Sequence, residues 1–113
     1  MTTIQLQNAF VATLARFLTS PWDIVKVRYE NYEVGKNNRR EIFQADYEIG
    51  GDRTSIRLSL EALDILEELQ QHRPEGQAES WTWLEFALDS AGRYRFEYKY
   101  GVPPLIAEQI RYS

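Results

Sequence analysis

The stretch Trp81-Thr-Trp-Leu-Glu-Phe-Ala-Leu-Asp-Ser-Ala-Gly-Arg-Tyr-Arg-Phe-Glu-Tyr-Lys-Tyr100 decides the fold. Apolar residues take alternate positions on both sides of a turn: Leu84, Phe86 and Leu88 before it, and Tyr94, Phe96, Tyr98 and Tyr100 after it. A period of two is typical of a strand with one buried face. Asp89-Ser90-Ala91-Gly92 separates the two runs and ends on glycine, as many β-turns do. The stretch therefore predicts a β-hairpin with these side chains facing the core.

A second hairpin is predicted upstream. Its strands run from about Trp22 to Val34, with Val25, Val27 and Tyr29 alternating, and from about Arg40 to Ile49, with Phe43, Ala45, Tyr47 and Ile49 alternating. Gly35-Lys36-Asn37-Asn38 lies between them, and Gly and Asn tolerate the positive φ of tight turns. After Gly50-Gly51-Asp52, a short third strand from Thr54 to Leu58 would direct Ile56 and Leu58 inward.

Helical periodicity marks three other segments. The first, from about Thr3 to Leu18, repeats apolar residues at the 3.6-residue period. Ser59 is a good N-cap for a second helix that runs to about His72 and buries Leu63, Leu66 and Leu69. Pro103-Pro104 can open a last short helix with Ile106 and Ile110 on one face.

These elements predict an α+β fold in the order α-β-β-(β)-α-β-β-α. Because every strong strand alternates, we expect an antiparallel sheet of four to five strands with helices packed on one face. The 113 residues suffice for one core, so residues 1–113 are predicted to form a single domain.

Composition indicates a cytoplasmic protein. The chain has no cysteine, which excludes disulfides and thiolate chemistry. It has no long apolar run and no basic, apolar start, so neither a membrane span nor a signal peptide is expected. The net charge of −4 would repel a phosphate backbone and suits a basic partner.

The hairpin from Trp81 to Tyr100 resembles the end of the YezG-like immunity proteins. In that family a strand with a tryptophan leads into an Asp-Ser-x-Gly turn and an aromatic strand ending in Tyr-x-Tyr. Trp22-Asp23 before the first strand and the order of elements are also similar. The resemblance implies a bacterial antitoxin that protects a cell by binding a toxin, often a nuclease. No catalytic or ligand motif defines the family, so it implies no site residues.

The residues themselves argue against an enzyme. A single histidine and no cysteine argue against a zinc site, and His72, at the predicted end of a helix, is better suited to capping that helix than to serving as the base of a catalytic triad. Asp46 and Glu48 share one strand face about 7 Å apart, a spacing compatible with acid–base chemistry, but any solvated strand face shows the same pattern. We therefore expect no enzymatic activity and no cofactor.

Direct binding of nucleic acid is also not expected. The candidate contacts are basic, namely Arg39-Arg40 and the stripe of Arg93, Arg95 and Lys99. The tyrosines beside that stripe alternate onto the opposite face, and Glu97 interrupts it. Cross-strand pairing with acids such as Glu85 explains these charges more simply.

The predicted toxin-binding residues are Trp83, Glu85, Asp46 and Glu48. Trp83 should point away from the core among these carboxylates, an arrangement typical of an interface with a basic, partly apolar partner. Together with the resemblance to YezG-like proteins, which implies a toxin as the partner, this makes a basic nuclease domain of that toxin the expected partner. Three other interpretations remain open for Trp83: cover by the loop after Gly76, cover by the C-terminal helix, or a homodimer contact. A general interaction or homodimerising domain is thus the alternative function.

Overall fold

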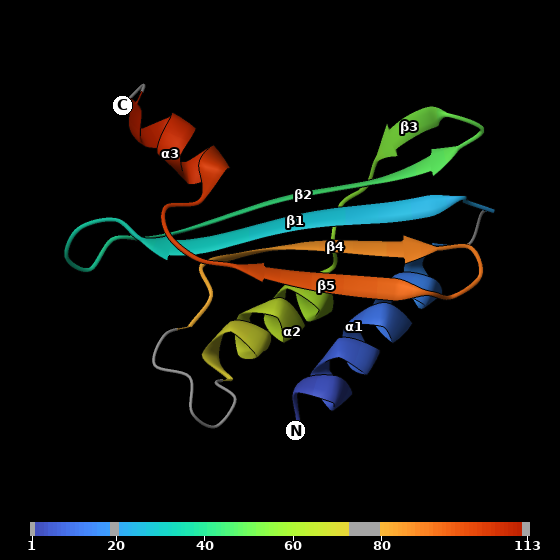
Figure 1. The fold of residues 1–113 in the computed structure, drawn as a ribbon, viewed down its shortest axis with the longest axis horizontal. Coiled ribbons are helices and arrows are strands. Elements are labelled where there is room, and N and C mark those ends of the chain that lie inside the picture. The colour runs from blue at the N-terminus through green and yellow to red at the C-terminus, as the bar shows by residue number, and fades with distance from the viewer. Residues whose placement is uncertain (1, 19–20, 73–79, 112–113) are drawn as a thin grey trace.

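A computed structural model describes residues 2–18, 21–72 and 80–111, which form a five-stranded sheet and three helices (Figure 1). The elements are α1 (Thr3–Phe17), β1 (Ile24–Glu33), β2 (Arg39–Ile49), β3 (Asp52–Ser55), α2 (Leu60–Gln71), β4 (Trp83–Asp89), β5 (Tyr94–Lys99) and α3 (Pro104–Arg111). The strand order is β3-β2-β1-β4-β5, and all neighbours are antiparallel. The predicted α+β class and element order are confirmed.

The core lies between the sheet and the pair α1 and α2. Phe10 of α1 is fully buried, and its ring meets those of Phe86 and Phe96 at centroid distances of 5.0 and 6.0 Å. Leu84, Phe86 and Leu88 are all buried, as their alternation predicts. Edge-to-face aromatic pairs of this kind add about 1 kcal/mol each beyond the burial of their area.

The hairpin turn between β4 and β5 is held by Asp89. Its carboxylate accepts hydrogen bonds from the backbone N–H groups of Ala91 and Arg93 and from the Arg93 guanidinium. The bond from the Arg93 N–H is the main reason that the pKa of Asp89 lies below its ordinary value. Gly92 has a φ of 88°, which glycine adopts without steric cost.

The third strand differs from its prediction: it spans Asp52–Ser55 instead of residues 54–58. Gly50 and Gly51 both have positive φ, 57° and 89°, so they form a two-residue turn that pairs Asp52 directly with Ile49. Beyond Ser55 the chain leaves the sheet toward α2. Ile56 packs against the core and Leu58 is buried, so both face inward as predicted.

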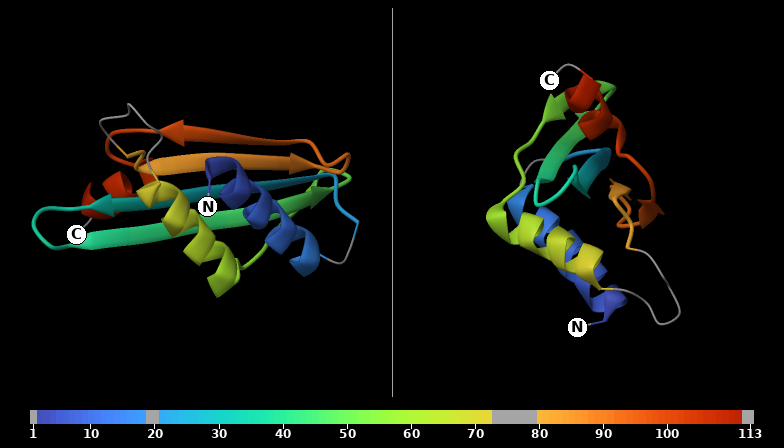
Figure 2. Two further views of the ribbon diagram at one scale, coloured as in Figure 1. Left: turned by 90° about the horizontal axis from the view of Figure 1, so that it is seen from below. Right: turned by 90° about the vertical axis from the view of Figure 1, so that its left-hand side faces the viewer.

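The helices differ from their predicted placement in one respect. α1 and α2 cover one face of the sheet as expected, whereas α3 lies against the opposite face (Figure 2). Glu30 of β1 points to that opposite face and is fully buried there. Its two carboxylate oxygens accept hydrogen bonds from the N–H groups of Leu105 (3.0 Å) and Ile106 (2.9 Å), and so cap the start of α3. Ile106 is buried, but Ile110 is 38% exposed and does not share its environment.

The aromatic face of β5 is only partly buried. Phe96 and Tyr98 pack against the core, but Tyr94 and Tyr100 are 40% and 49% exposed, contrary to their prediction as core residues. β5 is an edge strand, and α1 meets it through two hydrogen bonds, from Gln7 to Tyr98 and from Tyr94 to Asn8. The alternation is correct, but it does not reveal that the strand lies at the edge of the sheet.

Within residues 2–18, 21–72 and 80–111, no helix is long and apolar enough to cross a membrane.

Candidate functional site

The face of the sheet opposite α1 and α2, called the outward face below, carries all four residues that the sequence predicts as a binding site. The register pairs Trp83 with Glu30 and Glu85 with Arg28, across β4 and β1. On the other side of β1, Asp46 pairs with Lys26 and Glu48 with Ile24. α3 packs over one end of this face, at Glu30.

Trp83 is half-buried and held by two cations. The Arg28 guanidinium carbon lies 5.3 Å from the ring centroid, and Lys99 Nζ lies 4.8 Å from it. Cation–π contacts at such distances contribute about 0.5–1 kcal/mol each at exposed sites. The indole is therefore held in place before any partner arrives.

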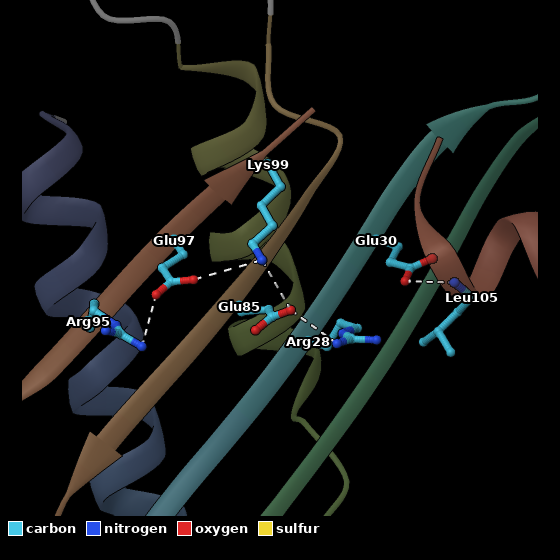
Figure 3. Close-up of polar contacts among 7 residues, drawn as sticks. All are labelled: Arg28, Glu30, Glu85, Arg95, Glu97, Lys99 and Leu105. Atoms are coloured by element: carbon cyan, nitrogen blue, oxygen red, sulfur yellow. Dashed lines mark hydrogen bonds and ion pairs between the residues drawn. The ribbon is translucent and has the colours of Figure 1, made fainter. Parts of the chain in front are cut away.

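Glu85 belongs to a chain of ion pairs that crosses three strands (Figure 3). It contacts Arg28 of β1 at 3.0 Å and Lys99 of β5 at 3.5 Å. Glu97 lies directly opposite Glu85 in the register, and Lys99, 3.9 Å from Glu97, offsets the repulsion between the two carboxylates. The Lys99–Glu85 contact confirms the predicted cross-strand pairing for Lys99, whereas Arg95 pairs with Glu97 of its own strand.

Asp46 and Glu48 form a separate cluster around Arg53 of β3. The Arg53 Nε atom lies 3.6 Å from Asp46 and 3.7 Å from Glu48. Asp46 Oδ1 is buried and accepts no hydrogen bond from the residues that the structure describes, so its contact with Arg53 is an ion pair only.

The outward face is therefore mixed in charge, which corrects the expectation of an acidic surface. Each of the four carboxylates Asp46, Glu48, Glu85 and Glu97 lies within ion-pair distance of an arginine or lysine of the same chain. The pairing cations Arg28 and Arg53 were missed because they come from other strands. Alternation places Arg28 on the polar face, whereas Arg53 lies before the predicted third strand. Only the register of β1 with β4 and of β2 with β3 identifies the partners of the two arginines.

A hollow of about 380 Å³ opens in the middle of the outward face, where Ala87 of β4 supplies only a methyl group. Its charged lining consists of Lys26, Arg28, Asp46, Arg53, Glu85, Arg95 and Glu97. The side chain of Lys26 is exposed and forms no ion pair or hydrogen bond with any residue of the described ranges. Trp83 and Glu48 lie outside the lining, so the hollow brings together only Asp46 and Glu85 of the predicted four.

A second hollow, of about 580 Å³, lies at the end of the core beside a buried polar network. Tyr29 donates a hydrogen bond to Glu41 and accepts one from Asn31 at 3.0 Å. Arg39 donates to Asn31 at 2.6 Å, and Gln70 of α2 donates to the backbone carbonyl of Asn31 at 2.7 Å. These bonds satisfy polar groups where the helix layer meets the sheet, so the network has a structural role.

The network predicts a loss of stability at alkaline pH. Burial, reinforced by the hydrogen bond with Glu41, raises the pKa of Tyr29 far above its ordinary value, and burial raises the pKa of Tyr98 as well. The folded state therefore keeps these protons more tightly than the unfolded chain. Their contribution is complete below about pH 10 and is lost above it, and for Tyr29 the loss is up to about 1.4 kcal/mol per pH unit.

Urea unfolding at about pH 9 and about pH 11 measures this effect. Tyr29→Phe removes the titrating hydroxyl. The free energy of unfolding of this variant should therefore fall less between the two pH values than that of the wild type. An equal fall in both proteins would show that Tyr29 does not cause the alkaline loss.

No group of three or more His, Cys, Asp or Glu side chains within the described ranges could hold a metal ion. No protein-family model matches the chain, and no curated protein matches it either. The candidate site therefore rests on its geometry: a mixed-charge sheet face with a held tryptophan and a central hollow.

Proposed function

We propose that this chain is an immunity protein, an antitoxin that binds and neutralises a cognate bacterial toxin in the cytoplasm through the outward face. The observation that carries the proposal is Trp83, which Arg28 and Lys99 hold on a sheet face that α1 and α2 leave uncovered. A pre-positioned aromatic side chain surrounded by charged groups has the properties of an interface anchor. The likeness of the hairpin from Trp81 to Tyr100 to YezG-like immunity proteins supports the same function.

The proposed mechanism is steric: this protein covers the active surface of the toxin and catalyses no reaction itself. The toxin's nuclease domain would dock over the outward face and lose access to its own substrate. Basic side chains of the toxin would form ion pairs with the carboxylates of Glu85 and Asp46, which border the hollow and also contact arginines of this chain. An acidic side chain of the toxin would meet Lys26, the exposed lysine of the lining. Complementary charges speed the encounter, while burial of Trp83 slows dissociation.

The function is tested by co-expression with the product of the gene immediately upstream, the candidate toxin. We expect the C-terminal domain of that product to arrest growth alone, and to co-purify with this protein in a stoichiometric complex that restores growth. Growth arrest that persists in the presence of this protein, with no complex formed, would contradict the proposal.

A further inference from the structure

The free edge of β5 has a regular pattern of backbone groups. β5 pairs with β4 alone, and no described strand lies on its other side. The Asp89 N–H donates to the Arg93 carbonyl at 2.9 Å, which fixes the odd-numbered positions as those bonded to β4. Tyr94, Phe96 and Tyr98 therefore direct their N–H and C=O groups away from the sheet. Three alternate positions with outward backbone groups can form hydrogen bonds with another strand.

We propose that a second copy of this chain pairs along this edge, with β5 antiparallel to β5 and the twofold axis at Phe96. The two sheets would then join into one continuous sheet. The side chains of Arg95 and Glu97 on this strand also line the outward-face hollow, but the inference does not depend on the antitoxin function.

Geometry leaves three central registers for this pairing. Only residues with outward backbone groups can form the hydrogen-bonded pairs, so the twofold axis falls at Arg95, Phe96 or Glu97. An axis at Phe96 uses all three outward positions, because Phe96 pairs with itself and Tyr94 pairs with Tyr98 of the second copy. An axis at either neighbouring residue uses two of the three in each chain.

Charge argues against the register with the axis at Glu97. With the axis at Phe96, Arg95 lies opposite Glu97 of the second copy, and the twofold symmetry repeats this attractive pair. With the axis at Arg95, two arginines oppose one another but Arg93 meets Glu97 of the second copy, so the number of outward backbone positions, and not charge, decides against this register. With the axis at Glu97, two glutamates oppose one another and Arg95 meets Lys99. Opposite charges stabilise directly facing strand positions and like charges destabilise them.

At the ends of the strand this register brings two basic residues together, but each already has an acidic partner in its own chain. Arg93 would face Lys99 of the second copy, but Asp89 already holds Arg93 at 2.8 Å and Glu85 holds Lys99 at 3.5 Å. In the single chain, Arg95 pairs with Glu97 of its own strand at 2.9 Å. The Arg95 side chain is 75% exposed, so its guanidinium can reach the second copy without leaving a buried partner.

Sedimentation analysis over a range of concentrations tests the proposal. We expect the wild-type mass to rise with concentration from 13.3 kDa toward twice that value. Arg95→Glu and Glu97→Arg each turn both attractive pairs into repulsive ones, so each variant should associate at least about tenfold more weakly. Circular dichroism confirms that each variant stays folded.

The decisive sample is an equal mixture of the two single variants. One chain then carries acids at both positions and the other carries bases, so the pair should associate where neither does alone. Leu60→Ala, at an exposed position of α2, serves as the control and should associate like the wild type. A wild-type protein that stays monomeric would overturn the proposal. Association that is unchanged by either charge reversal would also overturn it.

Discussion

Glu30→Ala is expected to lower the free energy of unfolding by about 2–3 kcal/mol, mainly by detaching α3. Glu30 is fully buried, and its oxygens are the acceptors for the N–H groups of Leu105 and Ile106. Without them, two donors at the start of the helix lose their charged acceptor in a buried place. Relief from burying a carboxylate offsets part of this cost, so we do not expect complete unfolding.

Urea denaturation measures the change, and hydrogen exchange at Leu105 and Ile106 shows whether it is local to α3. Glu30→Gln keeps one acceptor oxygen and should fall between the wild type and Glu30→Ala. Glu108→Ala is the matched control, because Glu108 is an exposed glutamate on the same helix. If Glu30→Ala lowers the free energy of unfolding no more than Glu108→Ala does, the role assigned to Glu30 is wrong.

Trp83→Ala is expected to weaken toxin binding by about 2 kcal/mol or more, roughly thirtyfold in Kd, and to leave the fold intact. The indole lies on the outward face, away from the core that Phe10 fills, so its removal opens no buried cavity. Removal also frees Arg28 and Lys99, which then keep only their contacts with carboxylates.

The measurement is calorimetric titration with the C-terminal domain of the upstream gene's product. Leu60→Ala is a matched apolar control, because Leu60 is 80% exposed on α2, on the other side of the molecule. Affinity that is unchanged in Trp83→Ala, with a wild-type circular dichroism spectrum, would remove Trp83 from the interface.

The two hairpins show what alternation in a sequence can predict. Strict alternation in β4 identifies Leu84, Phe86 and Leu88 as core, and the glycine-containing turns mark where strands reverse. The same pattern places Trp83 and Glu85 on the outward face. Short-range pattern is enough here, because strand faces and tight turns depend on neighbouring residues.

The charge balance of the candidate site depends on contacts that no local pattern contains. Arg28 meets Glu85 from a position 57 residues away, and Leu105 meets Glu30 from 75 residues away. The register of β1 with β4 sets the first contact, and the path of the chain after β5 sets the second. Local pattern therefore favours an acidic surface, whereas the folded chain pairs Asp46, Glu48, Glu85 and Glu97 with basic residues.

Ala87→Arg tests the central claim, that the outward face binds the toxin, most directly. A long side chain at this position would fill the hollow from its floor and obstruct docking, without entering the core on the other side of the sheet. We predict that the variant folds like the wild type but forms no stoichiometric complex with the C-terminal domain of the upstream gene's product, and no longer rescues growth. A folded Ala87→Arg variant that binds and protects as well as the wild type would show that the toxin docks elsewhere.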